Sequence, residues 1–168
     1  VLITGMTMMS DSMSPLSDLP QFAEMMQSFN DPLVGVVVGT LITGVIQSSA
    51  ASIGILQGLS MTGQITLSMA IPIVMGANIG TCMTAILSCI GVNRKAKRVA
   101  GIHVSIKVIG TILWLVIFYG LNSIFHFAFL SNRATTISIA IYHTIFNVVN
   151  TLVLFWFSNL IVKLVYRI

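Results

Sequence analysis

From residue 32 to residue 93 the chain contains no Asp, Glu, Lys or Arg. The four acidic residues all precede this stretch, and the eight basic residues all follow it. Only 7% of the 168 residues are charged and 56% are hydrophobic, whereas a soluble domain carries about 25% charged residues. Because so few charges cannot cover a soluble surface, we predict an all-α membrane protein. The apolar runs are long and do not alternate, which argues against an all-β barrel.

The basic residues concentrate in one cluster, which consists of Arg94, Lys95, Lys97 and Arg98. Such a cluster can bind nucleic acid or anionic lipid, but the positive-inside rule explains it more simply as a cytoplasmic loop. We therefore expect residues 94–98 on the cytoplasmic face of the cell membrane, in contact with lipid and with no nucleic acid. Counting spans from this loop places residues 10–31, 61–65 and 122–134 outside.

Residues 1–31 are predicted to form the end of a transmembrane helix followed by an outside amphipathic segment. The amphipathic segment, residues 10–31, contains all four acidic residues, and its apolar residues fall at helical spacing. This apolar stripe consists of Phe22, Met25, Met26 and Phe29. We expect the stripe to lie on the membrane or on a neighbouring helix. Because the chain begins at Val1 inside an apolar segment, we also expect it to be part of a longer protein.

A polar cluster at Gln47, Ser48, Ser49 and Ser52 interrupts the apolar run that follows Asn30-Asp31-Pro32. Asn30-Asp31-Pro32 supplies a capping residue and a first-turn proline, so we expect a helix to begin at this tripeptide. The run from Leu33 to Ile46 measures roughly 21 Å as a helix, and spanning needs about 20 residues. We predict a re-entrant helical hairpin over residues 33–60. One continuous helix from Leu33 to Leu59, with its serines bonded to helix carbonyls, remains an open alternative.

The next apolar segment, residues 66–90, is predicted to be a broken helix. Its interruption is Gly76-Ala77-Asn78-Ile79-Gly80-Thr81, in which two glycines bracket an Asn and weaken a continuous helix. A half-helix that begins near Asn78 or Gly80 would direct free N–H groups at the protein interior, where they suit an anion. Two consecutive segments broken by small polar residues near mid-depth indicate a transporter binding site.

Two further transmembrane helices are predicted at residues 99–121 and 135–165. The first carries His103 and Lys107 on one face, and the second carries a stripe of His143, Asn147 and Asn150. Intramembrane ionisable residues are functional candidates. Lys107, however, is close enough to the basic cluster to extend toward it, and polar stripes commonly hold helices together. We therefore expect structural or interfacial roles for these residues.

The two interruptions occur in a recognisable context. Asn30-Asp31-Pro32-Leu33-Val34-Gly35 precedes them, and Asn93-Arg94-Lys95-Ala96-Lys97-Arg98 follows with His103. This arrangement resembles the sodium/phosphate cotransporter family, the type II sodium-dependent phosphate transporters and their bacterial relatives. In that family a Gln-Ser-Ser-Ser cluster and a Gly-Ala-Asn-Ile-Gly-Thr-like break occur in each of two inverted repeats. One copy of each is present here, so the resemblance implies that residues 32–168 form the second of two inverted repeats.

The resemblance implies sodium-coupled uptake of inorganic phosphate across the cytoplasmic membrane, with this chain supplying one half of a central site. The implied phosphate-binding residues are Gln47, Ser48, Ser49, Ser52 and Asn78. The implied ligands of the co-transported sodium ion are Gln47, Ser48, Thr81 and Thr84. The other half of the site would come from a first repeat of the same protein or from a second copy of the chain.

Three residues depart from the family pattern. Ala50 replaces the third Ser of the polar cluster, Lys107 stands where the family usually carries Asn, and Ile106 stands where it carries Phe. The alternative interpretation is a non-transporting assembly or regulatory module of the membrane with a degenerate site. An enzyme is not expected, because Ser48 and Ser49 have no general base nearby in sequence and no membrane segment offers an acidic partner for a histidine.

Overall fold

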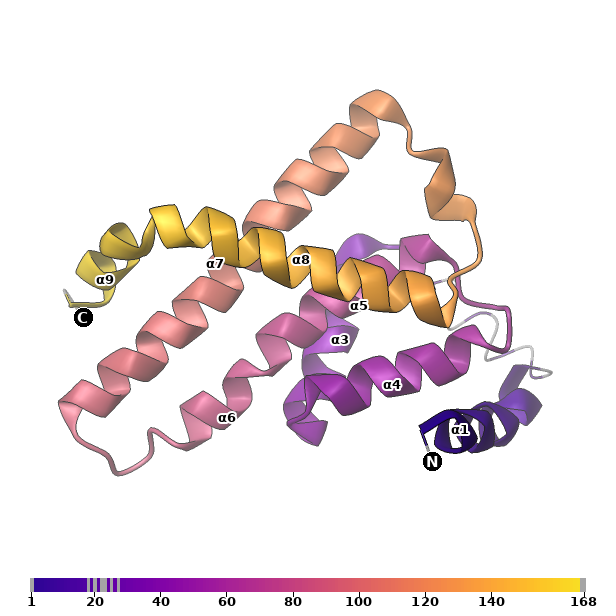
Figure 1. Cartoon of the computed structure of the whole chain (residues 1–168), viewed down its shortest axis with the longest axis horizontal. Coiled ribbons are helices and arrows are strands. Elements are labelled where there is room, and N and C mark those ends of the chain that lie inside the picture. Colours follow the sequence, from indigo (N-terminus) through magenta and orange to yellow (C-terminus); the bar gives the residue numbers. More distant parts are fainter. Residues whose placement is uncertain are drawn as a thin grey trace.

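The computed structural model describes residues 2–17, 19, 21, 24, 26 and 28–166. Within these ranges the regular elements are helices, and one isolated antiparallel bridge joins Thr66 and Arg133. In chain order the elements are α1 (Leu2–Ser17), α3 (Pro32–Ile46), α4 (Ser49–Ser60), α5 (Leu67–Gly80), α6 (Cys82–Leu87), α7 (Arg94–Phe125), the short 3-10 helix η1 (Ala128–Ser131), α8 (Thr136–Trp156) and α9 (Ser158–Tyr166). Figure 1 shows α8 crossing over α5 and the middle of α7.

Three helical segments of the described part are long and apolar enough to cross a membrane. They are Leu67–Leu87, Arg94–Phe125 and Thr136–Trp156. α3 is apolar as well but has 15 residues, and α4 has 12. The predicted all-α class, with long apolar helices, is confirmed.

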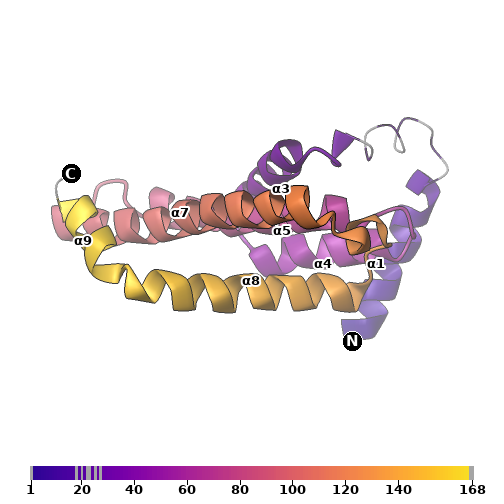
Figure 2. The same ribbon diagram turned by 90° about the horizontal axis from the view of Figure 1, so that it is seen from above.

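The helix α3 begins at the predicted cap and ends at the predicted polar cluster. Asp31 Oδ1 accepts hydrogen bonds from the N–H groups of Leu33 (2.8 Å) and Val34 (3.4 Å). At the other end, Gln47 has φ 59° and ψ 20°, which is left-handed backbone, and Ser48 is extended. A continuous helix through this point is therefore wrong, because the chain changes direction at Gln47 and Ser48 and α4 leads away toward α1 (Figure 2).

Glycines bring α3 and α5 into close contact. A Cβ added to Gly39 would lie 2.9 Å from the carbonyl carbon of Ile73, and one added to Gly76 would lie 2.8 Å from that of Val36. Thr40 Oγ1 donates a hydrogen bond to the carbonyl oxygen of Gly76 at 3.1 Å. Small residues at such positions let helix backbones approach one another in a membrane, where no hydrophobic effect drives the helices together.

The buried core lies where α4, α5 and α8 meet. Its members include Ile53, Leu56, Ile71, Val74, Ile139 and Phe146. Met26 of the predicted amphipathic stripe is buried in this core and Phe29 packs against it, whereas Phe22 and Met25 lie outside the described residues. The described part of the stripe thus packs on neighbouring helices, one of the two placements predicted for it.

Several helix boundaries differ from the prediction. α1 continues to Ser17, well beyond Met9. The basic cluster forms the first turns of α7, because Asn93 caps that helix by accepting a hydrogen bond from the Ala96 N–H at 2.9 Å. The expected loop at residues 94–98 is therefore wrong as a secondary-structure assignment. The last predicted helix is divided in two, since α8 ends at Trp156 and α9 begins at Ser158.

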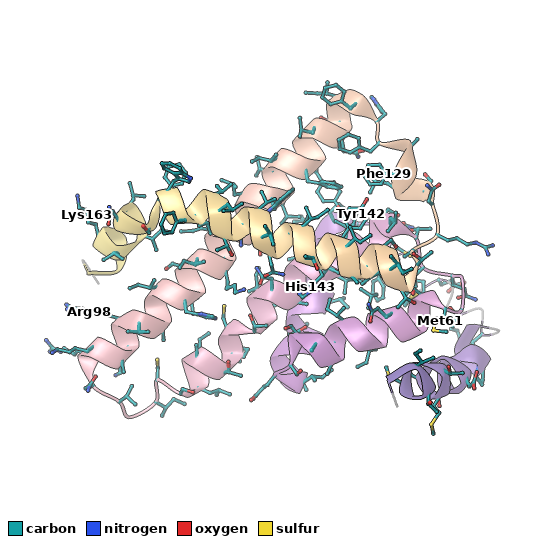
Figure 3. The ribbon with its side chains drawn as sticks, in the orientation of Figure 1. Met61, Arg98, Phe129, Tyr142, His143 and Lys163 are labelled. Carbon is teal, nitrogen blue, oxygen red and sulfur yellow. The ribbon has the colours of Figure 1, made fainter. Side chains whose placement is uncertain are left out.

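The loops predicted on one side of the membrane lie at one end of the molecule. The Leu67 N–H donates to the Asn132 carbonyl at 2.9 Å, and the Ala134 N–H donates to the Ile65 carbonyl at 2.8 Å. Figure 3 shows Arg98 and Lys163 at the opposite end from this pair of loops. The basic ends of α7 and α9 therefore share one side of the fold.

Candidate functional site

α3 and α5 are parallel neighbours. A Cβ at Gly35, near the start of α3, would lie 2.8 Å from Pro72 Cγ. A Cβ at Gly80, at the end of α5, would lie 2.6 Å from Thr43 Cβ. Residues that face each other are thus 37 positions apart at both ends of the contact. Because the offset stays near this value along the contact instead of changing steadily, the two helices run in the same direction.

This register places the α3–α4 turn beside the α5–α6 junction. Gln47 lies one turn beyond Thr43, and Thr84 lies one turn beyond Gly80. The same offset therefore puts Gln47 level with Thr84. The packing agrees, because a Cβ at Gly44 would lie 3.1 Å from Met83 Cγ. The structure thereby brings the two polar interruptions of the sequence to the same level of the fold. Among the described residues no hydrogen bond joins the turn to the junction.

The α3–α4 turn presents several polar groups. Ser48 Oγ accepts a hydrogen bond from the Ala51 N–H at 3.2 Å, so the Ser48 hydroxyl proton remains available to an acceptor. Ser49 is half-buried and Gln47 is exposed, and within the described part neither side chain has a hydrogen-bond partner. Ser52 is buried and donates to the Ser48 carbonyl at 3.1 Å, so Ser52 braces the turn from inside.

The α5–α6 junction presents acceptor oxygens. Thr81 Oγ1 donates to the Asn78 carbonyl at 2.6 Å, and Thr84 Oγ1 donates to the Thr81 carbonyl at 3.0 Å. Both hydroxyl protons are therefore committed to the helix backbone. The lone pairs of the two oxygens remain free for a cation.

A separate short helix, α6, begins at Cys82, two residues beyond Gly80, where the sequence predicted a half-helix to begin near Asn78 or Gly80. α5 continues through Asn78 to Gly80, and the interruption is a single residue. Thr81 keeps right-handed helical dihedrals (φ −62°, ψ −17°), and its N–H donates to the Ala77 carbonyl at 3.2 Å. The two glycines do not break the helix because Gly76 and Gly80 share one face, which packs on α3.

Asn78 lies near the middle of the apolar segment Leu67–Leu87 and contacts α7. Its Oδ1 accepts a hydrogen bond from Lys107 Nζ at 2.6 Å. Asn78 is only 5% exposed, and its Nδ2 atom is buried without a hydrogen-bond partner. Lys107 is half-buried and reaches α5 instead of extending toward the basic cluster at the start of its own helix.

The polar stripe on α8 lies against the same region. Figure 3 shows His143 where α8 passes over α5. Asn147 Nδ2 donates to the His143 carbonyl at 2.8 Å, a contact within α8. Asn150 is buried, and a Cβ added to Gly110 of α7 would overlap its amide group. Asn150 therefore sits directly on the α7 backbone, which fits the expected helix-packing role.

Two residues of this region were not predicted as site residues. Thr43 is fully buried one turn before Gln47, and its Oγ1 has no hydrogen-bond partner. Thr43 lies four residues before Gln47, and this helical spacing was the sequence signal that could have placed it near the polar turn. Lys107 was visible as a lone charge inside an apolar segment, but its contact with Asn78 joins residues 29 positions apart. Such a pairing follows from how α5 and α7 pack and not from local sequence.

Sequence comparisons relate the chain to known proteins. The family model for the Na+/Pi-cotransporter matches residues 1–159. The uncharacterized protein YqeW of Bacillus subtilis (strain 168) is 32% identical over 153 residues, which cover 90% of this chain and 49% of that protein. Human sodium-dependent phosphate transport protein 2B is 42% identical over 64 residues, or 38% of this chain and 9% of that protein. Rat sodium-dependent phosphate transport protein 2A is 46% identical over 55 residues, which cover 33% of this chain and 9% of that protein.

The chain spans about half the length of YqeW and a small part of the mammalian transporters. No solved structure matches the chain. Because the family model covers nearly all of its residues, the chain belongs to the Na+/Pi-cotransporter family.

Proposed function

We propose that the chain supplies one half of the central site of a sodium-coupled transporter of inorganic phosphate. The observation that carries this proposal is the register of α3 and α5, which sets the polar turn at Gln47 level with Thr84. Two polar interruptions that are separate in sequence then lie side by side between apolar helices. Family membership and the names of the mammalian relatives supply the solutes.

The turn suits a phosphate oxygen. The Ser48 and Ser49 hydroxyls and the Gln47 amide offer donors that other described groups do not use. Ser52 holds the backbone of the turn in place through its bond to the Ser48 carbonyl. Asn78 would add a buried amide NH₂ group from the face of α5 that packs on α7. Tetrahedral oxyanions accept hydrogen bonds from several directions, so an oxyanion can use donors from more than one helix face.

The junction suits sodium. Thr81 and Thr84 keep free lone pairs, and the carbonyl oxygen of the Gln47 amide and the Ser48 hydroxyl lie at the same level. Sodium is a hard cation, and hydroxyl and amide oxygens are hard ligands. The chain has no acidic residue after residue 31, so no carboxylate from residues 32–168 balances the sodium charge. The phosphate anion would balance it, and this mutual neutralisation couples the two solutes.

The helices α3 and α4 form a re-entrant hairpin in this proposal. With 15 and 12 residues, each is too short to cross a hydrocarbon layer of about 30 Å at 1.5 Å per residue. The hairpin would enter the cell membrane from outside, with residues 94–98 cytoplasmic. The position of the basic ends of α7 and α9 on one side of the fold supports this orientation.

The second half of the site would come from another repeat, which makes this chain one of two inverted units. The chain covers 49% of YqeW, a protein long enough to contain a second unit of similar size. The outward face of α3 is apolar and exposed, as expected for contact with lipid or with that second unit. It carries Leu33, Val37, Leu41 and Val45. A first repeat or a second copy of the chain would fill this role.

Equilibrium binding of labelled phosphate to the complete protein in detergent tests the proposal. We expect saturable binding in sodium buffer and little in choline buffer. Gln47→Ala and Ser48→Ala should each weaken binding about tenfold or more, the loss expected for a hydrogen bond to a charged ligand. Ser123→Ala, an exposed hydroxyl on α7 bonded to its own helix, is the matched control. Wild-type protein that binds no phosphate, or binding unaffected by both substitutions, would contradict the proposal and favour a non-transporting module.

A further inference from the structure

We propose that Lys107 is a built-in counter-charge for the transported anion, placed at the middle of the membrane and held by Asn78. This inference rests on the proposed function and names a specificity-determining residue within it. Three properties of the residue support this role: the depth of its ammonium group, the hydrogen-bonding chemistry of its partner and the distribution of charge in the chain.

The depth follows from the partner. Asn78 is the twelfth of the 21 residues in the apolar segment Leu67–Leu87. Lys107 Nζ lies 2.6 Å from the Asn78 side chain, so the ammonium group sits at the same mid-depth. Along α7, Lys107 is separated from Arg94 by roughly 20 Å of helix. The Lys107 charge is therefore distinct from the basic cluster at the start of α7.

The hydrogen bonds show which kind of solute suits this pair. A lysine ammonium has three donors and no acceptor, so the Asn78 oxygen must face it and the Asn78 NH₂ group must point elsewhere. That NH₂ group is buried without a partner, and the described structure gives the ammonium no hydrogen bond besides the one to Asn78. Apart from the second lone pair of Asn78 Oδ1, the unused groups of the pair are donors. A positively charged, donor-rich pair suits an oxyanion better than it suits a sodium ion.

Among the described residues, Lys107 forms no ion pair with a carboxylate; its side-chain hydrogen bond goes to Asn78. The described ionisable side chains that interact electrostatically with Lys107 are the Cys82 thiol and the His143 imidazole, neither of which is a carboxylate. An unpaired charge inside a membrane is costly, and the cost falls when an opposite charge arrives. Phosphate is the anion that the proposed site would deliver.

The inference predicts how phosphate binding depends on this charge. Lys107→Gln shortens the side chain by one atom, keeps a donor for Asn78 and removes the charge. We expect the apparent dissociation constant for phosphate to rise about ten- to one-hundred-fold, the range for losing a hydrogen bond from a charged group in a buried site. We also expect a higher sodium concentration for half-maximal binding, because sodium must then supply all of the positive charge. Lys107→Arg should stay within about threefold of wild type.

The test uses labelled phosphate binding to the complete protein at a series of sodium concentrations. Lys97→Gln removes the same charge from an exposed position at the start of α7 and serves as the control. Wild-type affinity and wild-type sodium dependence in Lys107→Gln would overturn the inference while leaving the proposed function in place. Wild-type protein that binds no phosphate at all would overturn both.

A second measurement covers the case in which Lys107→Gln does not fold. The ¹³Cε resonance of Lys107, assigned by its loss in Lys107→Arg, is followed as inorganic phosphate is added to wild-type protein in sodium buffer. We expect it to move with phosphate and to stay unchanged when chloride is added at equal ionic strength. A resonance that phosphate does not move would overturn the inference.

Discussion

Gln47 carries two separable roles within one residue. Its backbone is left-handed (φ 59°), a conformation that ends α3 and lets Ser48 cap α4. Left-handed backbone costs a residue with a Cβ roughly 1–2 kcal/mol, whereas glycine adopts it freely. The Gln47 side chain is exposed, and the register of α3 and α5 places the residue level with Thr84. A larger residue has been placed where glycine would be easier, which is typical of functional positions.

Substituting Gln47 separates these roles. In Gln47→Gly the turn should be as stable as in wild type or more stable by about 1 kcal/mol, because the strain is relieved. In Gln47→Ala the strain remains. Both variants lose the amide, so both should lose sodium-dependent phosphate binding. Thermal unfolding followed by circular dichroism, together with the binding assay, checks this; a Gln47→Gly protein that binds phosphate normally would show that the side chain has no role.

At the scale of elements, the contact of α3 with α5 decides whether the two polar interruptions meet. Gly39 and Gly76 have backbone carbonyls of the partner helix where a Cβ would lie. Backbone atoms cannot move aside as a flexible side chain can. The contact therefore tolerates no side chain at these two positions without separating the helices.

Paired glycine substitutions test this contact. Gly39→Ala should lower the free energy of unfolding by about 3 kcal/mol, the upper range for overpacking a tight interface, and should abolish phosphate binding. Gly54→Ala is the matched control, since nothing lies within 4 Å of a Cβ there; it should raise stability by about 0.5–1 kcal/mol through helix propensity. Thermal unfolding in detergent measures both. Equal effects of the two substitutions would contradict the account.

The elements also show which parts of the fold are readable from sequence. The start of α3 and its end at Gln47 were predictable because the cap at Asp31 and the polar turn are local signals. The continuation of α5 through Asn78 was not, because Gly76 and Gly80 resemble a helix break until their packing on α3 is known.

The same distinction applies to the candidate site and to the other helix ends. The residues of the polar turn were predictable from sequence, whereas the contact of Lys107 with Asn78 depends on how α5 and α7 pack. The division of the last helix at Phe157 had no glycine or proline to mark it. The role of each predicted ligand remains a prediction that the binding assays address.

At the scale of the whole molecule, the fold has two distinct ends. At one end, the loops around Ile65 and Asn132 are hydrogen-bonded to each other. The basic start of α7 and the basic end of α9 lie at the other end. Three apolar segments connect these ends, while α3 and α4 stop short. In the proposed function, the polar turn between α3 and α4 would form, together with a second unit, a binding site that each side of the membrane can reach in turn.

The central claim is that this site couples phosphate movement to sodium. The most direct test is uptake of labelled phosphate by sealed vesicles that contain the complete protein, driven by an inward sodium gradient. We predict uptake that requires the gradient, is lost in Ser48→Ala and is retained in Ser123→Ala. Uptake that is equal with and without the gradient, or that persists in Ser48→Ala, would contradict the claim.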